Sequence, residues 1–445
     1  MRTKGEGPNV ISTSLLVKYS FIAVPVAFAG FPLYVLAPDY YVTHHGVSLT
    51  LLGALLLVIR LMDAVIDPLI GFLIDTFQKH LKLFAITAAC PLCFAIFGLF
   101  NFTFFDPIRW FSLCMIFAVT AYSVLTITLG AYATMWTTNV HDQTRIAGAR
   151  EAFGLMGLII AVSTPKTISS LTQASTVYLW YGFLLALLMV IGVTCFLSLP
   201  QIFETQKKQR PSLLKGVRTL DQKTKRLFAI YGLNMLASSI PSILVIFYVR
   251  DLLGAEKFIG LFLILYFLSG VLFIPFWNKI SVSHGKYKTW FISNIVAVSG
   301  FIGAFFLGHG DIAPYALVCS LSGLALGADL TLPPSLLSDH IHGQKKTEYS
   351  GTYYALMTFI AKMSLAFASA IVLPTLDYAG FKPNEANADH ALLTLSLAYS
   401  LIPCVLKGLS MGLIYFYFIK LKTGGKNELV ENHVNPGSTD DAKWL

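Results

Sequence analysis

The sequence predicts an all-α membrane protein with twelve transmembrane helices in two bundles of six. Of the 445 residues, 56% are hydrophobic and only 12% are charged. The surface of a water-soluble protein of this length could not accommodate such a composition. Apolar runs of about 20 residues, the length that crosses a bilayer, recur twelve times. One basic stretch separates the first six runs from the last six.

The individual spans follow from hydropathy, because each must keep its backbone hydrogen bonds within a helix while it crosses the lipid. We expect them near residues 14–38, 47–75, 83–104, 109–136, 150–170, 177–199, 227–249, 257–277, 288–308, 313–337, 351–375 and 392–419.

The polar stretch defines the domain organisation: an N-terminal bundle at 1–200, a linker at 201–226 and a C-terminal bundle at 227–421. The linker carries eight Lys and Arg residues. Because basic loops stay in the cytoplasm, this loop is expected there, and an even number of spans then puts both termini in the cytoplasm. The tail, 422–445, is expected to be disordered.

Composition also excludes some partners and activities. The net charge of +9 is explained by cytoplasmic loops and requires no nucleic-acid partner. The six cysteines fall within apolar spans without metal-ligand spacing, which favours packing roles. No zinc-protease pattern, phosphate loop or nucleophile elbow is present, so an enzyme is not expected. A transport-dead membrane sensor is the alternative of another class, although no soluble domain is appended.

Two carboxylates stand in the middle of the second span. Asp63 and Asp67 are four residues apart, and Arg60 shares their helical face. Ionisable groups at this depth are costly and usually functional. A structural ion pair between Arg60 and one carboxylate is the alternative, but it leaves the second carboxylate in need of a proton or a metal ion.

The residues from Arg60 to Gly71, Arg-Leu-Met-Asp-Ala-Val-Ile-Asp-Pro-Leu-Ile-Gly, resemble the helix II signature of the glycoside-pentoside-hexuronide:cation symporters, the melibiose permease family. Further similar segments lie at 142–150, 338–339 and 358–362, and the resemblance spans nearly all of 14–420. It implies a major facilitator fold with a substrate site at mid-membrane between the two halves. It also implies symport by alternating access.

The resemblance assigns the coupling cation to Asp63, Asp67 and the hydroxyl of Thr126. Carboxylate and hydroxyl oxygens form a partial shell for a hard cation. Ile66 replaces an amide residue of the family at the position before Asp67. The coupling ion is therefore H⁺ or Na⁺, with Asp63 and Asp67 as metal ligands only in the Na⁺ case. No other cofactor is expected.

On the substrate side, the two acids that the family uses to bind sugar are replaced by Ala27 and Leu129. The resemblance retains Arg150, Thr358 and Lys362. Losing acids while keeping bases favours an anionic small solute, of the uronate, polycarboxylate or carboxylate siderophore type. A lysophospholipid or other amphiphile and a neutral glycoside are alternative substrates. A structural pair between Arg150 and the next residue, Glu151, is the alternative role for that arginine.

Other polar residues inside the spans are candidates for the same cavity. We assign Asn234 and Tyr354 to substrate binding, although polar groups such as Asn234 also hold membrane helices together. Arg60, Asp329 and Lys407 are assigned to a charge network. In the alternatives, Lys362 pairs with Asp329, and Lys407 reaches toward the interface or pairs locally.

The last assignment concerns the segment after the second carboxylate. Gly71 and Asp75 are expected in the loop after the second span, as a gating loop. The protein is expected to be a monomeric multi-pass protein of the cell membrane, the inner membrane if the source is bacterial.

Overall fold

The computed structural model describes residues 11–47, 49–104, 106–137, 139–171, 176–201, 217–218, 220–383 and 385–420. All regular structure in these ranges is helical. Most of the expected linker and the whole expected tail lie outside the described residues.

Within the described ranges, the first bundle contains six helical rods. The first rod is broken into α1 (Thr13–Phe21), α2 (Ala23–Phe31), a π-helical segment (Pro32–Leu36) and α3 (Ala37–His45). The others are α4 (Leu49–Thr76), α5 (Leu81–Asn101), α6 (Pro107–Trp136), α7 (Val140–Leu171) and α8 (Val177–Leu197), with the short 3₁₀ turn Gln78–His80 between α4 and α5.

The second bundle also contains six rods. They are α10 (Gln222–Phe247), α11 (Ile259–His284), α12 (Lys286–Phe301), α13 (Ile312–Gly343), α14 (Ser350–Tyr378) and a last rod made of α15 (Asp389–Ser396), a π-helical segment (Leu397–Leu401), α16 (Ile402–Ile414) and a second π-helical segment (Tyr415–Lys420). The 3₁₀ turn Thr347–Tyr349 precedes α14.

Among the described residues, eleven helices are long and apolar enough to cross a membrane. The remaining rod is α4, which is 28 residues long and carries the two carboxylates. The expected order of six and six rods is confirmed. Several helices are longer than expected: α7 begins ten residues before the span expected at 150–170, and α13 and α11 continue to Gly343 and His284. Polar helix ends project beyond the hydrocarbon, where hydropathy carries no signal.

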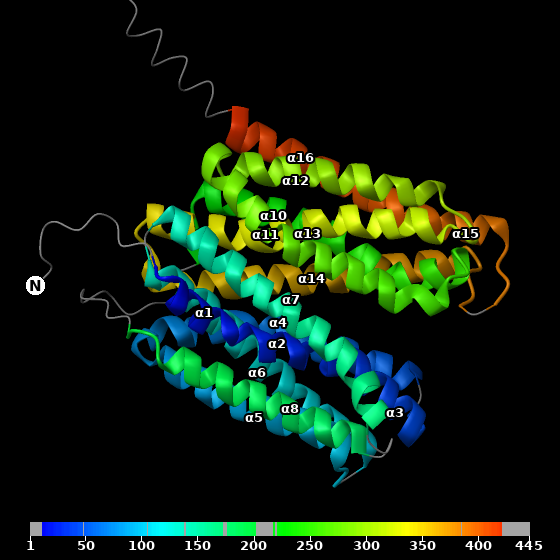
Figure 1. The fold of residues 1–445 in the computed structure, drawn as a ribbon, viewed down its shortest axis with the longest axis horizontal. Helices are drawn as coiled ribbons and strands as arrows, with labels where there is room; N and C mark the ends of the chain where they lie inside the picture. The colour runs from blue at the N-terminus through cyan, green and yellow to red at the C-terminus, as the bar shows by residue number, and fades with distance from the viewer. Residues whose placement is uncertain are drawn as a thin grey trace, which may run out of the picture.

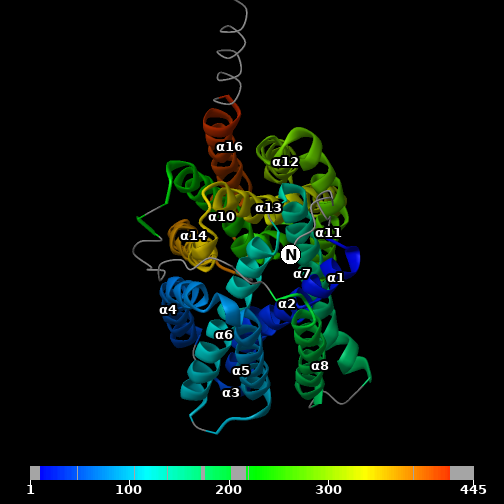
Figure 2. The same ribbon diagram turned by 90° about the vertical axis from the view of Figure 1, so that its left-hand side faces the viewer.

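The two bundles lie side by side, and Figure 2 shows them end-on, with α4, α5, α6 and α8 in one and α10, α12, α14 and α16 in the other. The described chain begins and ends at the same end of the rods, which we call the terminal face; the opposite end, with α3 and α15, is the distal face (Figure 1). The ribbons of the bundles converge toward the terminal face and separate toward the distal face.

Small residues allow the closest helix contacts. A Cβ atom at Gly71 of α4 would lie 2.5 Å from the carbonyl oxygen of Gly351 in α14, and one at Gly351 would lie 2.6 Å from the carbonyl oxygen of Gly71. In lipid, helix association depends on such close packing because the hydrophobic effect gives little drive. This glycine pair therefore holds the two bundles backbone to backbone near the terminal face.

Candidate functional site

The central charges lie at one depth. Asp63 in α4 and Lys362 in α14 are roughly 20 Å along their helices from the terminal face, at about 1.5 Å per residue. Asp329 in α13 lies at a similar depth. A common depth near the middle of the rods is where a transporter of two bundles holds its solute.

Lys362 of the second bundle bridges both carboxylates of the first. Its Nζ atom lies 2.6 Å from Asp63 Oδ2 and 2.8 and 2.9 Å from the two oxygens of Asp67. Both aspartates are buried, while the Lys362 side chain is 22% exposed. The described ion pairs of these two carboxylates go to Lys362, and the alternative of a structural pair with Arg60 stays a prediction. One ammonium neutralises one carboxylate, so the triad of Asp63, Asp67 and Lys362 has room for one more positive charge.

One hydroxyl group at this triad comes from Ser123. It donates to Asp63 Oδ1 at 2.9 Å and accepts from Lys362 Nζ at 2.7 Å. The Thr126 hydroxyl instead donates to the carbonyl oxygens of Tyr122 and Ser123, each at 3.1 Å. The structure therefore does not bring Thr126 to the carboxylates. Ser123 lies one helical turn before Thr126 on α6. Its hydroxyl group is the only feature of the sequence that could have predicted this contact.

Arg150 of α7 is already paired. Its Nε and a terminal nitrogen donate to Glu151 Oε1 at 2.9 and 2.6 Å. Tyr19 and Tyr354 lie close enough to interact electrostatically with the guanidinium. The geometry thus matches the alternative of an Arg150–Glu151 pair. The Glu151 carboxylate also lies near the centre, although Glu151 is not among the predicted site residues.

Tyr354 and Thr358 both lie on α14. The Tyr354 hydroxyl donates to the carbonyl oxygen of Pro334 at 3.1 Å and accepts from Thr134 of the first bundle at 3.2 Å. The Thr358 hydroxyl donates to the carbonyl oxygen of Ala355 at 2.9 Å and also lies close enough to interact with Asp67 of the triad. Tyr354 therefore joins the two bundles, and Thr358 lies one turn before Lys362.

A second charged cluster lies within the second bundle. Lys407 Nζ donates to Asp329 Oδ2 at 2.6 Å, to Asn234 Oδ1 at 2.9 Å and to Asn294 Oδ1 at 3.1 Å. The indole nitrogen of Trp290 donates to Asp329 Oδ1 at 3.0 Å. The alternative that Lys362 pairs with Asp329 is therefore wrong. Asn234 belongs to this second cluster because its side-chain oxygen accepts a hydrogen bond from Lys407.

Asp75 connects the bundles at the terminal face. Its carboxylate accepts from the backbone N–H groups of Gly351 and Thr352 at 2.6 and 2.7 Å and from the Thr352 hydroxyl at 2.5 Å. These donors are in the first turn of α14, where a carboxylate also interacts favourably with the helix dipole. The expectation of a loop at Gly71 and Asp75 is wrong, because both lie within α4; the polar residues after Gly71 continue the helix.

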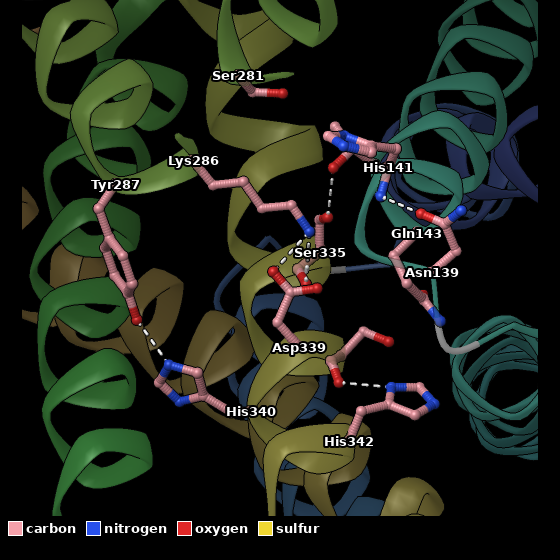
Figure 3. Close-up of polar contacts among 12 residues, drawn as sticks. Asn139, His141, Gln143, Ser281, Lys286, Tyr287, Ser335, Asp339, His340 and His342 are labelled. Carbon is pink, nitrogen blue, oxygen red and sulfur yellow. Dashed lines mark hydrogen bonds and ion pairs between the residues drawn. The ribbon is translucent and has the colours of Figure 1, made fainter. Parts of the chain in front are cut away.

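More polar contacts at the terminal face surround this connection. The Thr144 and Ser335 hydroxyls, one from each bundle, are 3.0 Å apart. In Figure 3, Lys286 reaches from α12 toward Asp339 and Ser335 of α13, and its Nζ lies 2.6 Å from Asp339 Oδ2. The polar contacts described here between the bundles therefore lie at mid-depth or toward the terminal face, and together they close that end.

Comparison with known proteins places this geometry in a family. The family model described as MFS/sugar transport protein matches residues 18–420. A glucuronide carrier protein homolog of Escherichia coli (strain K12) is 25% identical, with 92% of this chain and 93% of that protein covered. A putative sulfoquinovose importer of the same organism is also 25% identical, over 84% of this chain and 85% of that protein. Among solved structures, a bacterial homologue of the iron transporter ferroportin in an outward-facing state has a TM-score of 0.66 at 15% identity, covering 89% of this chain and 98% of that chain.

The chain is a multi-pass membrane transporter of the major facilitator class. It belongs to the MFS/sugar transport protein family, which confirms its resemblance to the glycoside-pentoside-hexuronide:cation symporters. It is a transporter and not an enzyme.

Proposed function

We propose that this transporter is a cation-coupled symporter that works by alternating access and carries an anionic small organic solute, with H⁺ or Na⁺ as the coupling ion. The observation that carries the proposal is the shared position of Lys362 between Asp63 and Asp67. Two buried carboxylates with one ammonium retain one negative charge, which a proton or Na⁺ neutralises.

The coupling follows from competition for the same oxygens. A cation that joins the triad competes with the Lys362 ammonium for the oxygens of Asp63 and Asp67 and weakens their hold on it, so the ammonium presents its positive charge to the space between the bundles. An anionic solute binds that charge as a point contact. Because each ligand favours the arrangement that the other requires, cation and solute tighten each other's binding.

Alternating access requires that the contacts at the terminal face break. The bonds from α14 to Asp75 and the contact between Thr144 and Ser335 hold that face closed. By the distribution of basic residues the terminal face is cytoplasmic, so this arrangement corresponds to the state that receives solute from outside. Neutralising the triad weakens the ion pair between α4 and α14, and with solute bound the bundles can rock.

A neutral hydroxylated solute is the second candidate, and the Arg150–Glu151 pair favours it. Glu151 occupies the Nε donor and one terminal-nitrogen donor of the guanidinium and supplies a carboxylate acceptor for hydroxyl groups. The relatives named for glucuronide and sulfoquinovose support the anionic candidate.

The test is uptake into proteoliposomes that hold the purified transporter under an imposed H⁺ or Na⁺ gradient. The panel contains glucuronate, citrate, a neutral disaccharide and a lysophospholipid. We expect concentrative uptake of an anion by the wild type and its loss in Asp63→Asn and in Asp67→Asn. Asp377→Asn removes an exposed carboxylate and should transport normally. Gradient-driven uptake by both Asp63→Asn and Asp67→Asn contradicts the proposal. Uptake of the neutral disaccharide alone also contradicts it.

A further inference from the structure

A small pocket opens at the terminal face of the first bundle, far from the charged triad. It has a volume of about 200 Å³ and lies between the turn Gln78–His80, the start of α5, Tyr132 of α6 and Gln201 just after α8. Sites for drug-sized ligands usually have about 300–1,000 Å³. The pocket therefore fits a small head group better than a whole solute.

The charge in this pocket is positive. Lys79, His80 and Lys82 line it, and none of its described lining residues is acidic. Lys79 and His80 are exposed. Lys82 donates to the carbonyl oxygens of Leu197, at 2.7 Å, and Leu199, which leaves one of its three N–H groups for a ligand. A compact group with negative oxygens complements these donors.

One wall of the pocket continues into an apolar stripe. Leu83 lines the pocket and is 54% exposed. Ile86, Cys90 and Phe94 follow it on the same face of α5, and all three are exposed. Residues spaced by three and four positions form a continuous stripe along a helix. A ligand bound at the basic end can therefore lay hydrocarbon along α5.

We propose that this pocket is a binding site for the phosphate of an anionic phospholipid, with Lys79, His80 and Lys82 around the phosphate and the acyl chains against the exposed stripe of α5. Basic pockets between membrane helices at the cytoplasmic side recognise such head groups. The apolar stripe is what favours a lipid over a free phosphate ion.

The site also has a structural connection to the closed terminal face. The side-chain nitrogen of Gln78 donates to the carbonyl oxygens of Thr347 and Glu348, in the turn before α14, at 3.2 and 3.0 Å. The turn that carries Lys79 and His80 therefore contacts the second bundle. A lipid that orders this turn stabilises the closed arrangement.

The test is lipid binding to the full chain after purification in detergent and removal of bound lipid. Native mass spectrometry measures the lipid that is retained, and thermal unfolding measures the stabilisation. The probes are dioleoylphosphatidylglycerol, dioleoylphosphatidylcholine and inorganic phosphate. We expect retention and stabilisation by the anionic lipid only. Removing both exposed bases, Lys79→Ala with His80→Ala, should weaken its binding by at least about fivefold. Lys82 is left intact because it also holds the end of α8.

The matched control removes two exposed bases of the second bundle at the same face, Lys279→Ala with Lys288→Ala, and should leave binding unchanged. Equal loss in both double variants means that only general surface charge attracts the lipid, which overturns the proposal. Equal binding of the two lipids, or stabilisation by inorganic phosphate alone, also overturns it. None of these measurements depends on which solute or cation is transported.

Discussion

The ammonium nitrogen of Lys362 lies 2.6 Å from Asp63 Oδ2 and so joins the two bundles by an ion pair at mid-depth. The two residues are far apart in sequence and come from α14 and α4. Because Asp67 shares the same ammonium, the pair belongs to a triad that lacks one positive charge. The ion pair therefore connects cation binding with the relative position of the bundles.

The first prediction concerns the connection at Asp75. The substitution Asp75→Ala removes the carboxylate that accepts hydrogen bonds from the first turn of α14. Loss of a helix cap of this kind costs about 1 kcal/mol of stability. The state that is open at the terminal face should then be about fivefold more populated. Spin labels at the exposed positions 79 and 288, in a cysteine-free background, report the separation of the bundles. An unchanged distance distribution would show that Asp75 does not hold the face closed.

The second prediction concerns the glycine contact. In Gly71→Ala the new methyl group meets the Gly351 carbonyl at 2.5 Å, a backbone atom that cannot rotate away. Overpacking of this kind costs about 1–3 kcal/mol, so the closed face should be destabilised and the thermal midpoint lowered. Gly260→Ala meets no atom within 4 Å and should be neutral or slightly stabilising. Equal effects of the two substitutions would contradict this.

The third prediction concerns the Asp329–Lys407 pair. Lys407→Met leaves Asp329 charged and buried without its cation, which costs about 3–5 kcal/mol. Adding Asp329→Asn removes the orphaned charge, and the double variant should recover most of the lost stability. Thermal unfolding of the three proteins in one detergent provides the comparison. A double variant no more stable than Lys407→Met would refute the pairing.

The fourth prediction is a pH dependence at the start of α10. Burial tends to raise the pKa of Asp221, but hydrogen bonds from Thr224, the nearby charge of His340 and a hydrogen bond from Gln344 together hold the pKa below its usual value. A lowered carboxylate pKa gives stability that is present above the unfolded value of about 3.9 and is lost as the pH falls through the folded value.

The corresponding variant is Asp221→Ala, which removes the cap of α10. At pH 7 it should cost about 1 kcal/mol, and the difference from the wild type should shrink below pH 4. Thermal midpoints measured between pH 3 and pH 8 test this, with Asp377→Ala as the control. A difference that stays constant across the range would show that the ionised form is not what stabilises the helix.

Much of the fold was predictable because hydropathy has a direct physical cause in the bilayer. The boundaries of α7 and α13 were not, since their polar ends lie where water satisfies the backbone and composition no longer marks the helix. Gly71 and Asp75 were assigned to a loop for the same reason.

The charged residues of the central triad were predictable one by one, but their contacts were not. Asp63, Asp67 and Lys362 were all identified, yet the bond between them crosses from one bundle to the other and leaves no periodic signal. The hydroxyl was placed at Thr126 instead of Ser123 because one helical turn separates two residues of similar chemistry. The sequence indicates Glu151 only as a neighbour of Arg150, since sequence alone does not show which carboxylates reach the centre.

The most direct test of the central claim is the cation affinity of Lys362→Met, measured by thermal stabilisation in Na⁺ titrations and in pH titrations. Because the variant lacks the ammonium that competes for Asp63 and Asp67, its apparent affinity for the coupling cation should rise by about tenfold or more. Lys382→Met, which removes a lysine that is 71% exposed, should behave as the wild type. An affinity for both cations that is unchanged or weaker in Lys362→Met would contradict the account.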